Sequence, residues 1–217
     1  LSAYLITELL LRERETTGSI HIKAFYVRRI LRIWPLYFIF ILILFPYELF
    51  TTDNLRLYYA MTLLFAGNWY SVLWGEIATL TGHLWTISVE EQFYLVWPLL
   101  MRYSRPRSFV RILIVMFAGS TAYRTLQICF GAVSDVAIHN NTFTRIDCFA
   151  LGGLLACASH WRPVVLSAGR RAALVVLSAT MYWIVALAHG ELLNFSTAWT
   201  YLIAASGSML CVMAFAA

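Results

Sequence analysis

Charged residues are scarce in this chain. Asp, Glu, Lys and Arg make up 12% of the 217 residues, whereas a soluble domain carries about 25%. So little charge cannot solvate the surface of a globule. Hydrophobic residues account for 61% of the chain, and the mean hydropathy is +0.72. The composition therefore excludes an ordinary soluble domain.

Lysine and paired cysteines are also nearly missing. Lys23 stands among fifteen arginines, and the basic residues lie in short clusters between apolar runs. A nucleic-acid binder would gather them on one polar face, so we expect no nucleic-acid partner. The four cysteines form no CxxC pair and have no histidine cluster beside them: Cys129, Cys148, Cys157 and Cys211. We therefore expect no metal site.

Apolar runs are what the chain has in abundance. They cover residues 1–11, 31–50, 57–74, 83–101, 109–131, 142–160, 171–190 and 197–217. Most approach the roughly 20 residues that a helix needs to span hydrocarbon. No repeat or linker divides them. The pattern predicts an all-α, polytopic transmembrane helical bundle, forming one integral-membrane domain over residues 1–217 in the lipid bilayer.

The basic clusters indicate the orientation. They occupy residues 12–32, 102–111 and 162–171, and positively charged loops tend to lie in the cytoplasm. Three apolar runs separate the first two clusters, so one run must fail to cross. The weakest is 57–74, which Gly67 and Asn68 interrupt. We predict that it forms a short re-entrant or interfacial helix on the outer side, covered by protein or by a water-filled cavity.

Two adjacent glutamates lie within the apolar segment HLWTISVEEQFYLVWPLL, residues 83–100. A charge at the centre of a membrane helix costs about 2.5–3.5 kcal/mol, which favours a functional role. On an α-helix one face would carry His83, Thr86, Glu90, Tyr94 and Trp97. Glu91 would lie about 100° away on a more apolar face. We predict that Glu90 faces the bundle interior and that Glu91 is more dispensable; alternatively, Glu90 pairs with an arginine to lock helices together.

An arginine group opens the second apolar run, in FYVRRILRIWP. Arg28 and Arg32 are four residues apart, and Arg29 and Arg32 are three apart. Guanidinium groups match phosphate geometry, so the group suggests an anion site. Anchoring by the positive-inside rule would explain the same cluster.

Further ionisable residues occur in TFTRIDCFALGGLLA and in the run before it. Arg145 and Asp147 are two residues apart and do not face each other, so each needs a partner on another helix. Arg124 either faces inward or extends to the outer interface. Gly152 and Gly153 predict close helix contact.

Four motifs in this order resemble the membrane acyltransferase-3 family: LSAYLITELLLRE, FYVRRILRIWP, HLWTISVEEQFYLVWPLL and TRIDCFALGGLLA. These O-acyltransferases modify lipopolysaccharide O-antigen, exopolysaccharides and other surface glycans. Ala3 stands where the family usually has glycine. The family's catalytic histidine lies on a first transmembrane helix upstream of Leu1, so we expect this chain to be an N-terminally truncated fragment that is inactive alone.

The resemblance implies transfer of an acyl group, often acetyl, from acyl-CoA to a sugar hydroxyl of a cell-surface glycan or glycolipid. It implies a multi-pass protein of the bacterial inner membrane, with acyl-CoA as donor substrate and no tightly bound cofactor. The implied catalytic residues are Glu90, Arg29 and Arg32. The implied substrate-binding residues are Arg28, His83, Trp85, Ser88, Glu91, Tyr94, Arg145 and Asp147.

Two other classes of function fit the same residues. A transporter or channel would use intramembrane charges as a substrate path; inverted internal repeats would favour it, and none is evident. A non-catalytic acyltransferase-like membrane protein would use them for packing.

Overall fold

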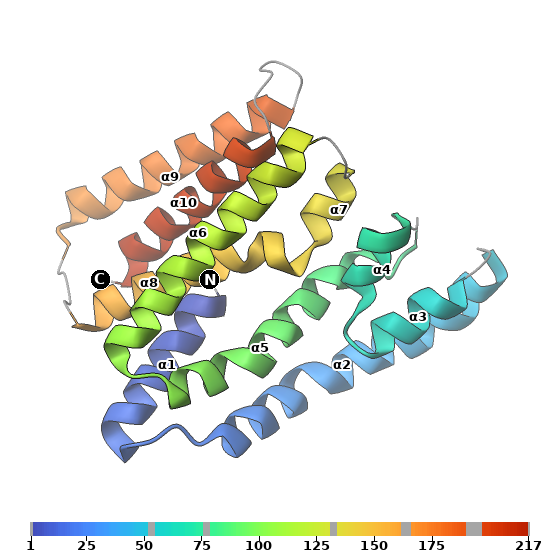
Figure 1. Cartoon of the computed structure of the whole chain (residues 1–217), viewed down its shortest axis with the longest axis horizontal. Coiled ribbons are helices and arrows are strands. Elements are labelled where there is room, and N and C mark those ends of the chain that lie inside the picture. The colour runs from blue at the N-terminus through green and yellow to red at the C-terminus, as the bar shows by residue number, and fades with distance from the viewer. Residues whose placement is uncertain are drawn as a thin grey trace. The chain divides into compact units, whose positions relative to one another are not determined.

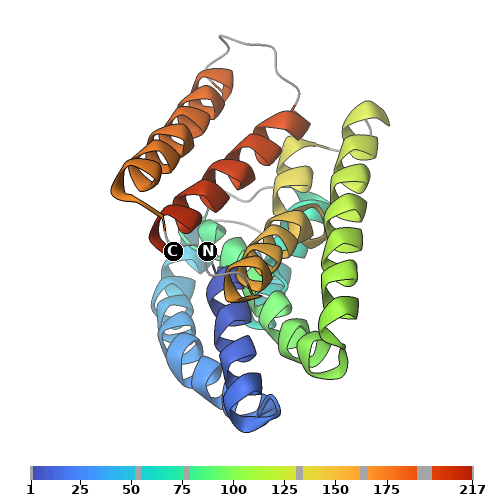
Figure 2. The same ribbon diagram turned by 90° about the vertical axis from the view of Figure 1, so that its left-hand side faces the viewer.

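Helices dominate the part of the chain that the structure describes. The computed structural model describes residues 2–51, 55–75, 79–130, 134–161, 166–189 and 197–216. Within these ranges there are ten α-helices, one 3₁₀ turn and no strand (Figures 1 and 2). The all-α prediction is confirmed.

Three of the described helices are long and apolar enough to cross a membrane. The three apolar segments are Ile22–Tyr47, Pro106–Phe130 and Ala168–Leu187. They belong to α2 (Ile22–Thr51), α6 (Pro106–Phe130) and α9 (Ala168–His189). Helices α5 (Trp85–Tyr103) and α8 (Thr142–Trp161) have 19 and 20 residues, but each carries ionisable residues in its N-terminal half. The protein is therefore an integral membrane protein, and the number of crossings stays a prediction. Arg162 of the third basic cluster lies outside the described residues.

The chain divides into two compact units, which we describe separately. Unit 1 comprises Leu1–Gly18, Pro106–Val133 and Phe143–Ala217. It holds α1 (Ser2–Thr17), α6, nearly all of α8, α9, and α10 (Thr197–Ala216). Helices α9 and α10 pack side by side in both views (Figures 1 and 2). The hydroxyl of Ser178 donates to the Gly207 carbonyl at 2.8 Å and joins these two helices.

Small residues bring α1 and α8 together within unit 1. A Cβ atom added at Gly152 would lie 3.0 Å from the Ala3 Cβ and 3.1 Å from the Tyr4 backbone nitrogen. A side chain at position 152 would therefore push against the backbone of α1. The predicted close contact at the glycine pair is confirmed for Gly152.

Unit 2 comprises Ser19–Arg105 and Ser134–Thr142. It holds α2, α3 (Leu55–Leu63), α4 (Gly67–Trp74), the 3₁₀ turn η1 (Gly82–Leu84), α5 and α7 (Asp135–Asn140). Helix α2 packs against α3 and α5, and α4 packs against α3, α5 and α7 (Figure 1). The apolar core of unit 2 contains Tyr37, Ile41, Leu55, Tyr58, Tyr59 and Leu84.

The weak apolar run 57–74 forms two short helices. Helices α3 and α4 have nine and eight residues, or about 14 and 12 Å at 1.5 Å per residue. Hydrocarbon is about 30 Å thick, so neither helix spans it. The break comes before the predicted Gly67, because Phe65 has a left-handed backbone with φ of 54°. Gly67 then begins α4, where a Cβ would lie 2.7 Å from the Thr62 hydroxyl oxygen.

We expect the two ends of this helical pair to lie on the same side of the membrane. Cysteine introduced as Arg56→Cys or Trp74→Cys should react with a membrane-impermeant maleimide from the same side, because neither short helix can carry the chain across. Mass spectrometry of intact cells and inverted vesicles distinguishes the sides. Labelling of the two positions from opposite sides would contradict the prediction.

Candidate active site

The two glutamates lie near the middle of α5. The helix starts at Trp85, after the 3₁₀ turn that contains His83. His83 therefore does not continue the face of Glu90, and its side chain is exposed, with its ring 5.5 Å from that of Phe40. The predicted stripe is wrong at this end, because the helix that defines the spacing has not yet begun.

Glu90 belongs to a chain of contacts that links α5 to α2. Its carboxylate accepts a hydrogen bond from the phenol of Tyr94 at 3.0 Å. The guanidinium of Arg29 lies over the Tyr94 ring, 4.7 Å from its centroid, and 5.6 Å from that of Phe25. A guanidinium over an aromatic face is attracted by the negative face of the ring. The structure thus brings together three predicted site residues: Arg29, Tyr94 and Glu90.

Glu91 also faces α2. The indole N–H of Trp34 donates to its Oε2 at 3.1 Å. Its Oε1 is buried and has no hydrogen-bond partner among the described residues. Both glutamates are half-buried. The carboxylate of Glu91 thus packs against a neighbouring helix, which the more apolar face predicted for Glu91 did not indicate.

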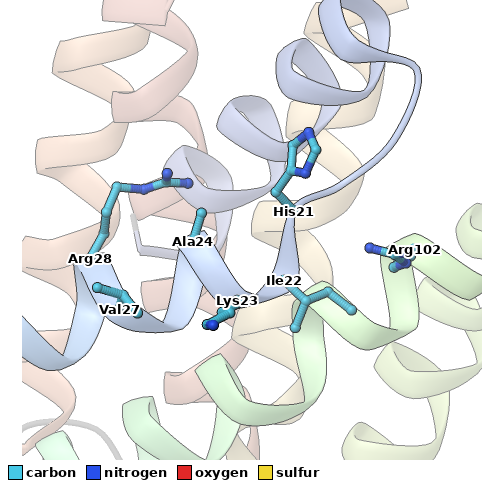
Figure 3. A pocket seen from close by; sticks show the side chains of 7 residues that line it. All are labelled: His21, Ile22, Lys23, Ala24, Val27, Arg28 and Arg102. Carbon is cyan, nitrogen blue, oxygen red and sulfur yellow. The ribbon is translucent and has the colours of Figure 1, made fainter.

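The three arginines of α2 have different surroundings. Arg29 is half-buried, whereas Arg28 and Arg32 are exposed. Arg28 lies at one end of an open cavity of about 600 Å³, and Arg102 lies at the other (Figure 3). The cavity is also lined by His21, Lys23 and the aliphatic side chains of Ile22, Ala24 and Val27. Cationic groups at an apolar cavity can accommodate a ligand that carries both phosphate and apolar groups.

A buried ion pair occupies unit 1. Arg124 Nη2 lies 2.6 Å from Asp147 Oδ2, and these side chains are 1% and 0% exposed. Arg124 also donates to the Thr144 carbonyl at 2.8 Å. The predicted cross-helix partner of Asp147 is therefore confirmed. The alternative in which Arg124 extends outward is wrong, because α6 places it against α8. Arg145, two residues before Asp147, is half-buried.

The remaining predicted residues of α5 contact protein. Trp85 is half-buried and packs its ring 4.9 Å from that of His139. Ser88 is fully buried and donates to the Leu84 carbonyl at 3.3 Å. The substrate-binding role of Trp85 and Ser88 stays a prediction.

Sequence reasoning missed a polar network beside the glutamates. Gln92 on α5, Asn68 on α4 and Thr142 at the start of α8 hydrogen-bond one another within unit 2. Asn68 is fully buried. An amide directly after two glutamates in an apolar helix was the available signal, because a buried amide needs partners.

Comparison with known proteins shows the family of this chain. The chain belongs to the acyltransferase-3 family, described as an acyltransferase domain, which it matches over residues 1–217. Peptidoglycan O-acetyltransferase OatA of Listeria monocytogenes is 28% identical over 142 residues, which cover 58% of this chain and 23% of that protein. O-acetyltransferase OatA of Staphylococcus aureus is 27% identical over 180 residues, which cover 76% of this chain and 29% of that protein.

A putative O-acetyltransferase of Staphylococcus aureus strain COL is 30% identical over 111 residues, or 46% of this chain and 18% of that protein. The chain thus matches less than a third of the length of each of these curated relatives. No solved structure matches it.

Proposed function

We propose that this chain forms the membrane part of an O-acyltransferase that moves an acyl group, chiefly acetyl, from acyl-CoA to a sugar hydroxyl. In the reaction, the hydroxyl oxygen attacks the thioester carbonyl carbon. A carbon–oxygen bond forms, the carbon–sulfur bond breaks, and the hydroxyl proton passes through a general base to the CoA sulfur. An imidazole suits that base at neutral pH, and the resemblance implies a histidine in this role.

The observation that carries the proposal is the contact between α2 and α5. The guanidinium of Arg29 lies 4.7 Å from the centroid of the Tyr94 ring, and the Tyr94 phenol donates to the Glu90 carboxylate at 3.0 Å. In this proposal Glu90 orients the base or the acceptor hydroxyl, and Arg29 binds the acyl-CoA thioester, both in the ground state and as the oxyanion that develops on its carbonyl. The family match adds independent support, because it covers both helices.

The donor would enter beside the first turns of α2. His21, Lys23, Arg28 and Arg102 line the cavity there, and Arg32 is exposed on the same helix. Guanidinium and ammonium groups bind phosphate oxygens through charge-assisted hydrogen bonds. We assign the phosphates of acyl-CoA to this basic region. The positive-inside rule places it in the cytoplasm, where CoA thioesters are made.

The acceptor is a cell-surface glycan or glycolipid. Two relatives are named as O-acetyltransferases called OatA, one of them for peptidoglycan. We propose an acceptor of this class, peptidoglycan or a lipopolysaccharide-type glycan, and a location in the bacterial inner membrane. The predicted multi-pass arrangement would let a cytoplasmic donor and an outer acceptor reach one protein.

Substituting Arg29→Lys or Arg32→Lys tests the donor role. Lysine keeps the charge, and with it the orientation signal, but loses the planar guanidinium fork. We expect normal membrane insertion and an increase of about tenfold in KM for acyl-CoA, as the loss of a charge-assisted bidentate fork implies. CoA release is measured in inverted membrane vesicles that carry the intact gene product.

Arg56→Lys is the matched control, because Arg56 is an exposed arginine of unit 2 outside this region. Its KM should not change. An unchanged KM in both test variants would contradict the donor role. A wild-type gene product that transfers no acyl group from any acyl-CoA would contradict the proposed enzyme and favour the non-catalytic alternative.

A further inference from the structure

The amide of Gln92 joins three segments of unit 2. Its Nε2 donates to the Phe65 carbonyl at 2.8 Å and to Asn68 Oδ1 at 2.9 Å. Its Oε1 accepts from the Thr142 hydroxyl at 2.6 Å. Asn68 Nδ2 in turn donates to Thr142 Oγ1 at 2.9 Å and to the Asn140 carbonyl at 3.1 Å. Both N–H groups and the oxygen of the Gln92 amide are thus used, so the side chain has one stable orientation.

The Phe65 carbonyl belongs to a strained turn. Phe65 has φ of 54°, a conformation that is uncommon for residues other than glycine, above all for bulky ones. Such a conformation persists only where the surroundings stabilise it. Gln92 supplies part of that stabilisation. The Phe65 amide adds another part by donating to the Thr62 carbonyl at 2.9 Å.

The turn places the Phe65 ring among the aromatic side chains of α2. The ring stacks on Tyr37, with centroids 4.5 Å apart, and lies 5.5 Å from the ring of Trp34. The Trp34 indole donates to Glu91, which directly precedes Gln92. A closed path of contacts therefore runs from Gln92 through Phe65 and Trp34 to Glu91.

This path ends at the Glu91 carboxylate. Among the described residues, Glu91 Oε1 is buried without a hydrogen-bond partner, and Oε2 is held by Trp34. The position of the carboxylate therefore depends on the position of the indole. The position of the Trp34 indole depends in turn on the Phe65 ring, which the strained turn places beside it.

We propose that Gln92 is a positioning residue, which holds the left-handed Phe65 turn against α2 and, through Phe65 and Trp34, places the Glu91 carboxylate. The role in catalysis rests on the proposed function. The placement itself does not, because it is a statement about the structure around Glu91.

A cysteine at position 91 reports the placement without an activity assay. In a Glu91→Cys protein with native Gln92, the thiol should lie beneath Trp34 and react slowly with N-ethylmaleimide. Adding Gln92→Met removes all three hydrogen bonds at nearly equal volume. We expect labelling to accelerate about tenfold or more, because the loss leaves buried polar groups unpaired and opens the turn locally. Mass spectrometry of the peptide that carries position 91 separates this thiol from the four native cysteines.

Two variants complete the labelling test. Gln127→Met is the matched control, because Gln127 on α6 bonds only locally in the structure, to the Tyr123 phenol four residues away; it should not change labelling at position 91. Gln92→Glu keeps the oxygen that accepts from Thr142 and loses the amide donors, so it should also accelerate labelling. Unchanged labelling in whichever Gln92 variant folds would overturn the proposal.

If neither Gln92 variant accumulates, labelling at position 91 in a Phe65→Gly variant tests the proposal. Glycine adopts a positive φ without strain, so the turn keeps its backbone and loses only the ring that contacts Trp34. Labelling at position 91 should then rise as well. An unchanged rate would show that the path through Phe65 does not place Glu91.

Kinetics separate positioning from general destabilisation. In the intact gene product, Gln92→Met should lower kcat about tenfold and leave KM for acyl-CoA unchanged, because it displaces a group that acts after donor binding. In a Glu91→Gln background, the same change should have less than about a twofold effect, since the two residues act through one path. If the effects of Gln92→Met and Glu91→Gln on kcat were fully additive, the proposed role of Gln92 in catalysis would be wrong. A wild-type protein without activity but with the expected labelling would refute the proposed function and leave the placement intact.

Discussion

Replacing Asp147 with alanine should lower the free energy of unfolding by about 3–5 kcal/mol. The change leaves the guanidinium of Arg124 with 1% exposure and without its carboxylate at 2.6 Å. Taking a charge out of water is costly, and the partner charge offsets that cost only while both are present. Denaturant titration of the protein in detergent measures the effect as a shift in the unfolding midpoint.

The double variant Arg124→Met with Asp147→Leu distinguishes this explanation from simple loss of packing. It removes both charges and keeps most of the side-chain volume, so its stability should lie close to that of the wild type. Arg12→Ala is the control for an exposed ion pair. Arg12 bonds Glu8 at 2.8 Å with a 74% exposed side chain, and its loss should leave the midpoint unchanged. A double variant as unstable as Asp147→Ala would contradict the prediction.

Glu90→Gln should abolish most acyl transfer at normal expression, with kcat lowered by about 10² or more, because the charge that orients the general base or the acceptor hydroxyl is lost. Glutamine keeps the size of the side chain and can still accept from Tyr94. The substitution therefore isolates the negative charge and the ability to accept a proton. Transfer to a glycan acceptor, measured as acetate released by mild base, gives the rate in membrane vesicles.

Glu91→Gln provides the comparison. The sequence alone predicts that this variant keeps most of its activity. The structure changes the expectation, because Glu91 faces α2 and has a buried oxygen without a partner among the described residues. We now expect a loss of about tenfold, smaller than that of Glu90→Gln, because a neutral amide replaces the carboxylate that Trp34 holds against α2. Full activity of Glu91→Gln would support the interpretation from sequence, in which Glu91 is dispensable. Full activity of Glu90→Gln would leave Glu90 with a packing role.

The sequence by itself determined the class of fold and the location of the helices. Scarce charge and long apolar runs leave no other way to satisfy the backbone in a bilayer than helices or closed barrels. The three-residue offset between Arg29 and Arg32 and the adjacency of Glu90 and Glu91 could also be read directly. So could the need of Asp147 for a partner on another helix, since residues two apart do not face each other.

Which side chains meet was decided by the tertiary structure alone. Helical spacing placed Glu90 and Glu91 about 100° apart, but it could not show that α2 passes close enough to hold both, one through Tyr94 and Arg29 and the other through Trp34. The left-handed Phe65 was equally invisible, because its local sequence favours no positive φ. Its carbonyl is bonded by Gln92, 27 positions later in the chain. Periodicity reports the direction of a side chain from its own helix axis, whereas a contact depends on where the second helix lies.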